Sequence, residues 1–501
     1  MKNIFLKLSV ILLLLSNNLA AQKSFLKSSI DDLNPRFLGN SIGDIVVANN
    51  FIWITNSKGL SRSSDAGKNW KNYSGIKEFS HPTIVSFLVK GDTIWTATVY
   101  DSTGVAIGGG FTVSTNRGES WVYFDQAKDQ RGDSVILYGN NIIKALPVTV
   151  NQQNVTYGVS MADNILWISS WSSGIRKSTD LGKTFSRILL PPDNLNSISP
   201  DSNRTFEINP RYNNNHMGFS VYAVDSLEIW AGTAGGVNKS TDGGVSWKKF
   251  NHQNQSSHIL GDWVIHINQQ KLKNKKRIWI TSWRADNPQN EDYGICYTEN
   301  GGDSWNTLLK GTKANILAFR DSVIYVGSDV GIFRSDNDGK SFELFSNIYD
   351  KQNGYRILNN QIISIAIQGD TIWLGTGDGL VYTIDNINKK FGTEWHIQRA
   401  FQPTKSSESY AYPNPFSPND ESIRIHYKIS GNSSKISLDI FDFGMNHIRN
   451  IINEITKTGL DEQEEIWNGK DKNGNRVPNG VYFYRLRIEN ENIWGKILVL
   501  E

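Results

Sequence analysis

One eight-residue pattern occurs six times between residues 63 and 342, and it constrains the fold more than any other feature of the sequence. Each copy has Ser or Thr first, Asp or Asn third, Gly fifth, a small polar residue seventh and an aromatic residue last. The copies are SSDAGKNW (63–70), STNRGESW (114–121), STDLGKTF (178–185), STDGGVSW (240–247), TENGGDSW (298–305) and SDNDGKSF (335–342). Such recurrence predicts a repeat protein in which each copy marks one structural unit.

An aromatic-centred alternating run precedes every copy, and a seventh run at 371–376 has no clean copy after it. The runs are FIWITN, TIWTATV, ILWISSW, EIWAGT, RIWITSW, VIYVGS and TIWLGT. A second alternating run, such as DIVVAN or ILAFRD, comes before them, and alternation of this kind indicates strands. Each unit is therefore expected to form four short antiparallel strands. Seven such sheets predict an all-β fold, a seven-bladed β-propeller over residues 36–400.

Every fixed letter of the pattern has a structural use at a tight turn between the third and fourth strands. A short carboxylate, amide or hydroxyl accepts hydrogen bonds from turn N–H groups, and Gly tolerates a positive φ. Asn stands in place of Asp in three copies, which suits a hydrogen-bond acceptor and would disable an acid catalyst. A structural role is therefore predicted for Asp65, Asn116, Asp180, Asp242, Asn300 and Asn337.

The six copies resemble the Asp-box, or BNR, repeat of sialidases, of other glycan-cleaving propellers and of many secreted propellers without enzymatic activity. The resemblance covers residues 36–400 and implies the propeller fold, but this repeat occurs in enzymes and binding proteins alike. A sialidase would also carry an Arg-Ile-Pro motif before its first blade. The nearest match here, YRIL at 355–358, lacks the proline and precedes the last blade.

The N-terminal residues 1–21 have a basic start, an apolar run and small residues at their end, a pattern typical of a secretory signal peptide. No later stretch approaches the roughly 20 apolar residues of a membrane helix. The mature chain is therefore expected to be secreted or attached to the cell surface, without a transmembrane segment. A formal net charge of only +3 gives no reason to expect nucleic acid as a partner.

The pattern changes after residue 400. A Ser- and Pro-containing linker at 401–412 leads into residues 413–501, whose dense alternating strands predict a small immunoglobulin-like β-sandwich. Five motifs follow one another there: YPNPFSP (412–418), IFDFGMNHIRNI (440–451), WNGKD (467–471) with NG at 473–474, GVYFYRL (480–486) and KILVL (496–500).

These motifs are similar to the C-terminal sorting domain of proteins exported by the type IX secretion system, in the variety that shares the immunoglobulin-like fold of flagellar hook-capping proteins. One departure is Asn468, where the family usually has Asp. The resemblance implies export through the periplasm, with the type IX secretion machinery as partner. It leaves open whether the domain is later cleaved or retained.

Propeller topology places the repeated turns on one face of the ring, and the long insertions fall almost entirely on the opposite face. Long loops on a rigid scaffold commonly carry function, so a ligand is expected on that face. Trp171 and Trp283 follow the aromatic strand at matching positions. The other candidates are the charged and aromatic residues of two nearby loops: Arg204, Glu207, Arg211, Arg284, Asp286, Glu291, Asp292 and Tyr293.

Exposed aromatic rings with carboxylates and arginines suit a sugar or a peptide segment. Alternatively, the two tryptophans merely close the mouth of the ring. The leading hypothesis is a non-enzymatic secreted or surface propeller that binds a glycan or a protein. The alternatives are a glycoside hydrolase, sialidase-like or of another type, and an assembly scaffold. No catalytic pair follows from sequence, because carboxylate separation is a three-dimensional quantity. No cofactor and no metal are expected, and the chain is expected to be monomeric.

Overall fold

The computed structural model describes residues 33–202, 205–285, 290–400, 409–419, 421–429, 433–458 and 462–500. Within these ranges the chain forms strands and one short 3-10 helix, Asn214–His216. No helix there has the length and apolar character needed to cross a membrane. The expected signal peptide and residues 401–408 of the expected linker lie outside the described residues.

Seven antiparallel sheets follow one another along residues 42–398 and are called sheets 1 to 7. Sheet 1 contains β1 (Ile42–Ala48), β2 (Phe51–Asn56), β3 (Gly59–Ser63) and β4 (Lys71–Tyr73). Sheet 2 contains β5 (Ile84–Lys90), β6 (Thr93–Ser102), β7 (Val105–Ser114) and β8 (Val122–Phe124). Sheet 3 contains β11 (Thr156–Ala162), β12 (Ile165–Ser170), β13 (Gly174–Ser178) and β14 (Ser186–Arg187). Sheet 4 contains β17 (Gly218–Ala223), β18 (Ile229–Thr233), β19 (Gly236–Ser240) and β20 (Trp247–Phe250), and β15 (Ser197–Ile198) pairs with β20 at its edge. Sheet 5 contains β21 (Trp263–Lys271), β22 (Lys276–Trp283), β23 (Gly294–Thr298) and β24 (Asn306–Leu308). Sheet 6 contains β25 (Ala314–Arg320), β26 (Val323–Ser328), β27 (Gly331–Ser335) and β28 (Glu343–Phe345). Sheet 7 contains β31 (Ile362–Gln368), β32 (Thr371–Thr376), β33 (Gly379–Ile384) and β34 (His396–Gln398).

Small extra elements lie in the connections between sheets. Strands β9 (Val135–Tyr138), β10 (Asn141–Ala145) and β16 (Glu207–Ile208) form a three-stranded sheet, and β29 (Tyr349–Asp350) pairs with β30 (Tyr355–Arg356).

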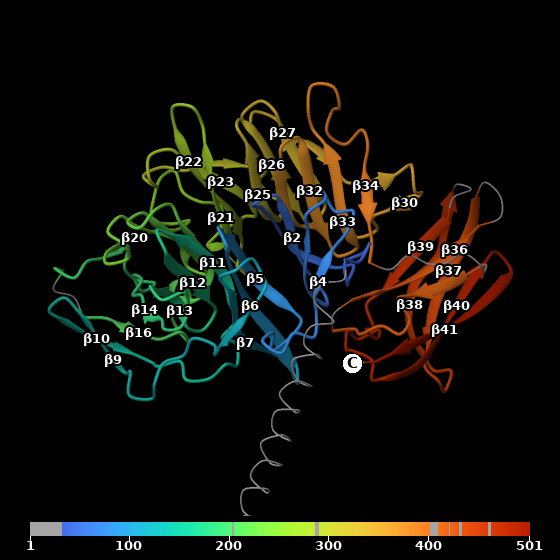
Figure 1. Cartoon of the computed structure of the whole chain (residues 1–501), viewed down its shortest axis with the longest axis horizontal. Coiled ribbons are helices and arrows are strands. Elements are labelled where there is room, and N and C mark those ends of the chain that lie inside the picture. The colour runs from blue at the N-terminus through green and yellow to red at the C-terminus, as the bar shows by residue number, and fades with distance from the viewer. Residues whose placement is uncertain are drawn as a thin grey trace, which may run out of the picture.

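The first strand of each sheet contacts the first strand of the next, and β1 contacts β31, so the seven sheets form a closed ring (Figure 1). All strands of sheet 1 come from residues 42–73 and all strands of sheet 7 from residues 362–398. The ring therefore closes by packing, and no strand is exchanged between its two ends. The Ala400 N–H donates to Asn40 Oδ1 at 2.7 Å and ties these ends together.

Aromatic side chains fill the space between neighbouring sheets. The second strand of each sheet contributes one fully buried ring: Trp53, Trp95, Trp167, Trp230, Trp279, Tyr325 and Trp373. The last residue of the repeated turn packs in the same cores, for example Trp70 with Trp373 and Trp305 with Trp230. Large aromatic rings supply much of the apolar area that such a ring must bury.

The repeated turns share one hydrogen-bonding scheme. In the turn at 240–247, Gly244 N–H donates to Ser240 Oγ at 2.8 Å and Ser246 N–H donates to Asp242 Oδ1 at 2.9 Å. The same two bonds, 2.8–3.0 Å long, recur in the turns of Asp65, Asn116, Asp180, Asn300 and Asn337. The fifth-position glycines have φ between 81° and 98°, a conformation that costs glycine least.

Sheet 7 carries a lengthened version of this turn. Gly392 N–H donates to Thr383 Oγ1 at 3.4 Å, and Trp395 is buried in the core that sheet 7 shares with sheet 6. An insertion after Asp385 separates these residues along the chain, which hides the pattern in the sequence.

A β-bulge interrupts the first strand of every sheet close to the end that follows the inter-sheet connection. The extra residues are Gly43 with Asp44 in sheet 1, then Val85, Tyr157, Phe219, Ile265, Asn315 and Ile363. A bulge re-aims the side chain of its extra residue away from the regular strand alternation. The seven bulges therefore set which side chains the ring presents near its connections.

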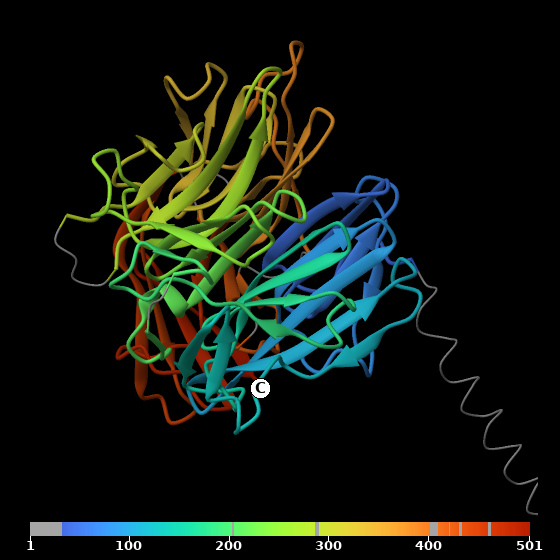
Figure 2. The ribbon, with the colours of Figure 1, turned by 90° about the vertical axis from the view of Figure 1, so that its left-hand side faces the viewer.

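The C-terminal domain consists of two facing antiparallel sheets. One contains β35 (Ser409–Tyr412), β36 (Ile423–Lys428) and β39 (Glu462–Trp467). The other contains β38 (His447–Thr458), β37 (Ser433–Phe441), β40 (Gly480–Ile488) and β41 (Glu491–Val499). Both contribute to a core that includes Trp467, Tyr484 and Leu486. In the view of Figure 2 this domain, coloured red, lies behind the ring.

Candidate functional site

The inter-sheet connections and the turns between second and third strands lie at one end of the ring, which we call the loop face. The C-terminal domain contacts the loop face at sheets 7, 1 and 2, which form its covered half. Sheets 3, 4 and 5 form the open half.

A buried carboxylate anchors the covered half. Asp378, in the turn between β32 and β33, has no exposed surface. It pairs with Arg399, which follows β34, at 3.2 Å, and with Arg424 of the C-terminal domain. Its Oδ2 also accepts the Leu358 N–H at 2.9 Å. A carboxylate removed from water in this way is stable only while its cationic partners stay in place.

Glu464 of β39 is the second anion of this interface. It lies 3.0 Å from Arg424 and 3.5 Å from Arg399, and it accepts a hydrogen bond from the Tyr412 hydroxyl. Burial acts to raise the pKa of Glu464, but the two arginines outweigh it and hold that pKa below its usual value. Glu464 is therefore ionised and pairs with arginines from both domains.

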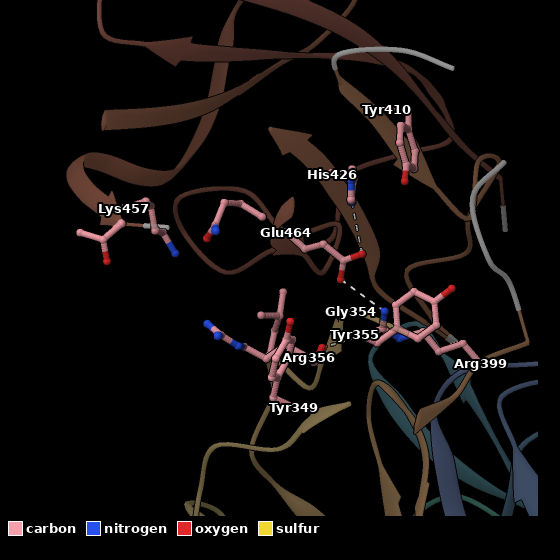
Figure 3. A pocket seen from close by; sticks show the side chains of 12 residues that line it. Tyr349, Gly354, Tyr355, Arg356, Arg399, Tyr410, His426, Lys457 and Glu464 are labelled. Carbon is pink, nitrogen blue, oxygen red and sulfur yellow. Dashed lines mark hydrogen bonds and ion pairs between the residues drawn. The ribbon is translucent and has the colours of Figure 1, made fainter. Parts of the chain in front are cut away.

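A cavity of about 100 Å³ lies beside these pairs, between the two domains (Figure 3). Tyr355, Arg356 and Arg399 line it from the ring, and Tyr410 and His426 line it from the C-terminal domain. Arg399 extends between the two sets of side chains toward Glu464. The cavity is thus part of the domain interface.

Two outlying ion pairs extend the contact to sheets 1 and 2. Lys58, in the turn between β2 and β3, lies 3.7 Å from Glu421, and Asp101 at the end of β6 lies 3.8 Å from Arg476. The C-terminal domain therefore touches three consecutive sheets across the point where the ring closes.

The open half carries four aromatic side chains that are linked through Phe219, which we call the aromatic platform: Tyr157, Trp171, Phe219 and Trp263. The Trp171 ring centroid lies 5.3 Å from that of Phe219 and 6.3 Å from that of Trp263. Phe219 lies 5.4 Å from Trp263 and 6.2 Å from Tyr157. All four are partly exposed, and Tyr157 keeps 41% of its surface accessible.

Three different sheets position the platform. Tyr157 and Phe219 are the bulge residues of β11 and β17, and Trp263 is the first residue of β21. The Trp171 N–H donates to Val155 O at 3.0 Å, which fixes the loop after β12. Because these supports are backbone contacts of the propeller itself, the four aromatic side chains are held in place before any ligand binds.

A cluster of three ionisable side chains lies next to the platform in sequence. His252 Nδ1 lies 2.9 Å from Asp262 Oδ2 and 3.6 Å from Glu291 Oε1. His252 and Asp262 belong to the connection between β20 and β21, and Glu291 belongs to the loop between β22 and β23. Each side chain is at most 14% exposed.

The structure places the predicted candidates in several environments. Trp171 lies in the platform and Glu291 in the cluster. Trp283 pairs with Trp263 across β21 and β22, donates its Nε1–H to Ala314 O at 2.6 Å, and lies under the Lys313 ammonium at 4.1 Å. Trp283 therefore connects sheet 5 to sheet 6 at the edge of the platform.

The remaining candidates make local contacts. The exposed Arg284 stacks on Tyr293 at 5.1 Å, and Asp292 pairs with Lys310 at 3.5 Å. Glu207 in β16 and Arg211 are exposed residues of a separate loop. Arg204 and Asp286 lie outside the described residues.

Five residues of the platform and the cluster were not predicted from the sequence: Tyr157, Phe219, Trp263, His252 and Asp262. Trp263 carried a usable signal, because a tryptophan that begins a first strand is placed at the loop face. The other four carried none, since they resemble ordinary strand and loop residues.

Comparison with known proteins identifies the fold of the ring. No family model matches the chain, and no curated protein matches it. Among solved structures, the GH74 enzyme of Niastella koreensis aligns with a TM-score of 0.52 at 13% identity, over 94% of this chain and 74% of that one. The GH74 xyloglucanase of Xanthomonas campestris aligns at 0.51 and 14% identity, over 79% of this chain and 59% of that one.

These neighbours are β-propellers, which confirms the expectation of an all-β propeller. At 13–14% identity the likeness shows the fold alone. PorZ, a surface component of the type IX secretion system of Porphyromonas gingivalis, aligns at a TM-score of 0.36 and 13% identity, over 92% of this chain and 66% of PorZ. A score of that size supports no functional argument.

Proposed function

We propose that this chain is a secreted or cell-surface, seven-bladed Asp-box propeller that binds an extended glycan or protein segment on its aromatic platform. The C-terminal domain is an immunoglobulin-like sorting domain that directs export by the type IX secretion system. The six repeated turns hold blade structure and take no part in binding.

The observation that carries the binding role is the platform itself. Four aromatic side chains are linked by contacts with centroid distances of 5.3–6.3 Å, on a face of the propeller where polar turns would suffice for folding. Partly exposed rings held by a rigid scaffold offer flat apolar surfaces to a sugar ring or an apolar side chain. Because the rings are already ordered, little conformational entropy is lost on binding.

Glycoside hydrolysis is the second candidate, and the cluster is the observation that favours it. The nearest carboxylate oxygens of Asp262 and Glu291 lie within 4.8 Å of each other, close to the roughly 5–5.5 Å between the carboxyl groups of retaining glycosidases. However, Asp262 Oδ1 accepts the His252 N–H and Glu291 Oε2 accepts the Asp262 N–H. Their other oxygens face His252. Both groups are thus engaged in holding loops, which favours binding without catalysis.

A glycan and peptide binding screen of the purified full chain, with sugar release monitored in parallel, tests this proposal. Trp171→Ala combined with Trp263→Ala should weaken binding of any ligand found by at least about tenfold, because stacking contacts contribute roughly 1 kcal/mol each. Trp494→Ala, which removes a 47% exposed tryptophan of the C-terminal domain, is the matched control. Unchanged binding by the double variant would refute the platform, and sugar release abolished by Glu291→Gln would establish the hydrolase instead.

Export is tested separately. Deletion of residues 413–501 should trap the protein in the periplasm, whereas residues 409–501 fused to a periplasmic reporter should carry the reporter out of the cell. Unchanged release of the truncated chain would refute the sorting role.

A further inference from the structure

The cluster of His252, Asp262 and Glu291 has a feature that neither the platform nor the fold explains. Three potential metal ligands, one nitrogen and two oxygens, lie within 4.8 Å of one another. We propose that they bind one divalent transition-metal ion, zinc or manganese. The inference is independent of which ligand the platform binds.

The distances suit a metal ion with little rearrangement. Bonds of about 2.0–2.2 Å place neighbouring ligand atoms about 3.0–3.5 Å apart. The separation of His252 Nδ1 from Glu291 Oε1 is 3.6 Å, close to that range. The separation of His252 Nδ1 from Asp262 Oδ2 is 2.9 Å and needs to open by only a few tenths of an ångström.

Backbone groups already orient both carboxylates. Asp262 Oδ1 accepts the His252 N–H at 2.8 Å, and Glu291 Oε2 accepts the N–H groups of Asp262 at 3.0 Å and Ala285 at 3.3 Å. The second oxygen of each carboxylate is thereby turned toward the same imidazole nitrogen. Orientation of ligands by outer hydrogen bonds is a regular property of metal sites.

The charge of the cluster is unbalanced without a cation. The three side chains are only 8%, 14% and 7% exposed. Within the described part of the chain no lysine or arginine lies within ion-pair distance of either carboxylate, and the Lys249 ammonium acts on Asp262 only from farther away. A protonated His252 leaves a net charge of −1 and a neutral one leaves −2. Buried uncompensated charge is costly, and a divalent ion would remove it.

The His252 ring presents Nδ1 to both carboxylates. Among the described residues, its buried Nε2 has no hydrogen-bond partner, so Nδ1 is the nitrogen through which the ring contacts the cluster. The proposed ligand atom of His252 is therefore Nδ1.

The ligand types select the metal. Imidazole with two carboxylates suits zinc or manganese, whereas calcium and magnesium prefer sites built from oxygen alone. An ion here would join the connection that precedes Trp263 to the loop that contains Glu291, and so would hold one edge of the platform. No metal was expected from the sequence, because the three residues match no spacing typical of a metal motif.

Isothermal titration of the chelator-treated full chain with zinc, manganese and calcium tests the site. One equivalent of zinc or manganese should bind, and Asp262→Asn with Glu291→Gln should weaken it by roughly a hundredfold or more. Asp292→Asn, which removes a neighbouring carboxylate paired with Lys310, should bind as the unaltered chain does. His252→Leu keeps both backbone-held carboxylates and guards against a variant that fails to fold.

A second measurement separates a built site from surface binding. Zinc should raise the melting temperature of the unaltered chain and of Asp292→Asn, and should leave that of His252→Leu unchanged. Cobalt substituted for zinc should give visible absorption bands only when His252 is present. Binding of calcium alone, no stoichiometric binding, or binding retained by both cluster variants would overturn the proposal.

Discussion

The bulge of the first strand carries Asp44 in sheet 1 but Tyr157 and Phe219 in sheets 3 and 4. Sheet 1 belongs to the covered half of the loop face, where Asp378 and Glu464 are neutralised by Arg399 and Arg424. Sheets 3 and 4 belong to the open half, where partly exposed rings face solvent. The same type of bulge thus presents a carboxyl group in sheet 1 and aromatic rings in sheets 3 and 4.

The two halves of the loop face differ because the covered half has a permanent partner, the C-terminal domain, whereas the open half would meet a ligand only temporarily. A domain on the same chain is always present, so buried charges can rely on fixed oppositely charged groups. A ligand from outside arrives and leaves, and a surface that must also be stable in water is better built from rigid aromatic rings. The largest test of this contrast is to remove one charge from the covered half.

Arg424→Ala should destabilise the covered half most. It leaves the fully buried Asp378 with Arg399 as its remaining cation and removes one cation from Glu464, a loss of about 3–5 kcal/mol for a buried pair. Thermal unfolding should shift downward, and small-angle scattering should show the C-terminal domain displaced.

Arg476→Ala is the matched control, because its 3.8 Å pair with Asp101 is partly exposed and should contribute less than about 1 kcal/mol. An unchanged scattering profile for Arg424→Ala would mean that the ionic contacts do not hold the domain.

Asp44→Asn sharpens the comparison within the ring. Burial raises the pKa of Asp44 to about 7, so the folded chain keeps a proton that the unfolded chain releases near pH 4. Ionisation of this group therefore opposes folding increasingly from pH 4 to pH 7. Asn keeps the hydrogen bond to the Ile45 N–H without the charge.

The two proteins should be equally stable at pH 4, and the variant should be more stable by about 1–3 kcal/mol at pH 8. Denaturant unfolding at both pH values measures this difference. A constant difference across pH would show that Asp44 is not the titrating group.

The smallest effect is expected on the opposite face, where both halves share the same turns. Asp242→Asn should cost less than about 0.5 kcal/mol, because Asn116, Asn300 and Asn337 make the same bonds in their own turns. Asp242→Ala should cost about 1–2 kcal/mol, because the exposed turn loses the hydrogen bonds that this carboxylate accepts from Ser240, Val245 and Ser246.

Asp65→Ala, in the repeated turn of sheet 1, should cost as much as Asp242→Ala in sheet 4 when measured by chemical denaturation. Unequal costs would mean that the two halves also differ on the face of the repeated turns.

Local patterns of the sequence predicted the repeating part of the fold. The tryptophans at 53, 95 and 167 are buried in second strands as their alternating runs indicated, and the repeated turns fall between third and fourth strands. The lengthened turn of sheet 7 escaped notice because an insertion separates Asp385 from Gly392. Local sequence patterns were therefore enough to predict those strands and turns that depend on residues close together along the chain.

The aromatic platform, the cluster and the domain interface depend on contacts between segments far apart in the sequence, which local sequence patterns do not reveal. Phe219 becomes part of the platform because a bulge shifts the register of β17 against β18, and that register is a property of the pair. Glu291 was predicted at the loop face, but its partners His252 and Asp262 come from another connection. Likewise, nothing in the local sequence links Asp378 to Arg424 in the other domain.

The closure of the ring has a mechanical consequence. Connecting segments of the chain join the other neighbouring sheets, whereas sheets 1 and 7 are held together only by noncovalent contacts, so their boundary is the place where the ring would open first under load. The C-terminal domain grips both sides of this boundary, through Lys58 on one side and Asp378 on the other. The C-terminal domain therefore crosslinks sheets 1 and 7. Under a force applied at the C-terminus, its contacts with both sheets would have to break before the propeller could open.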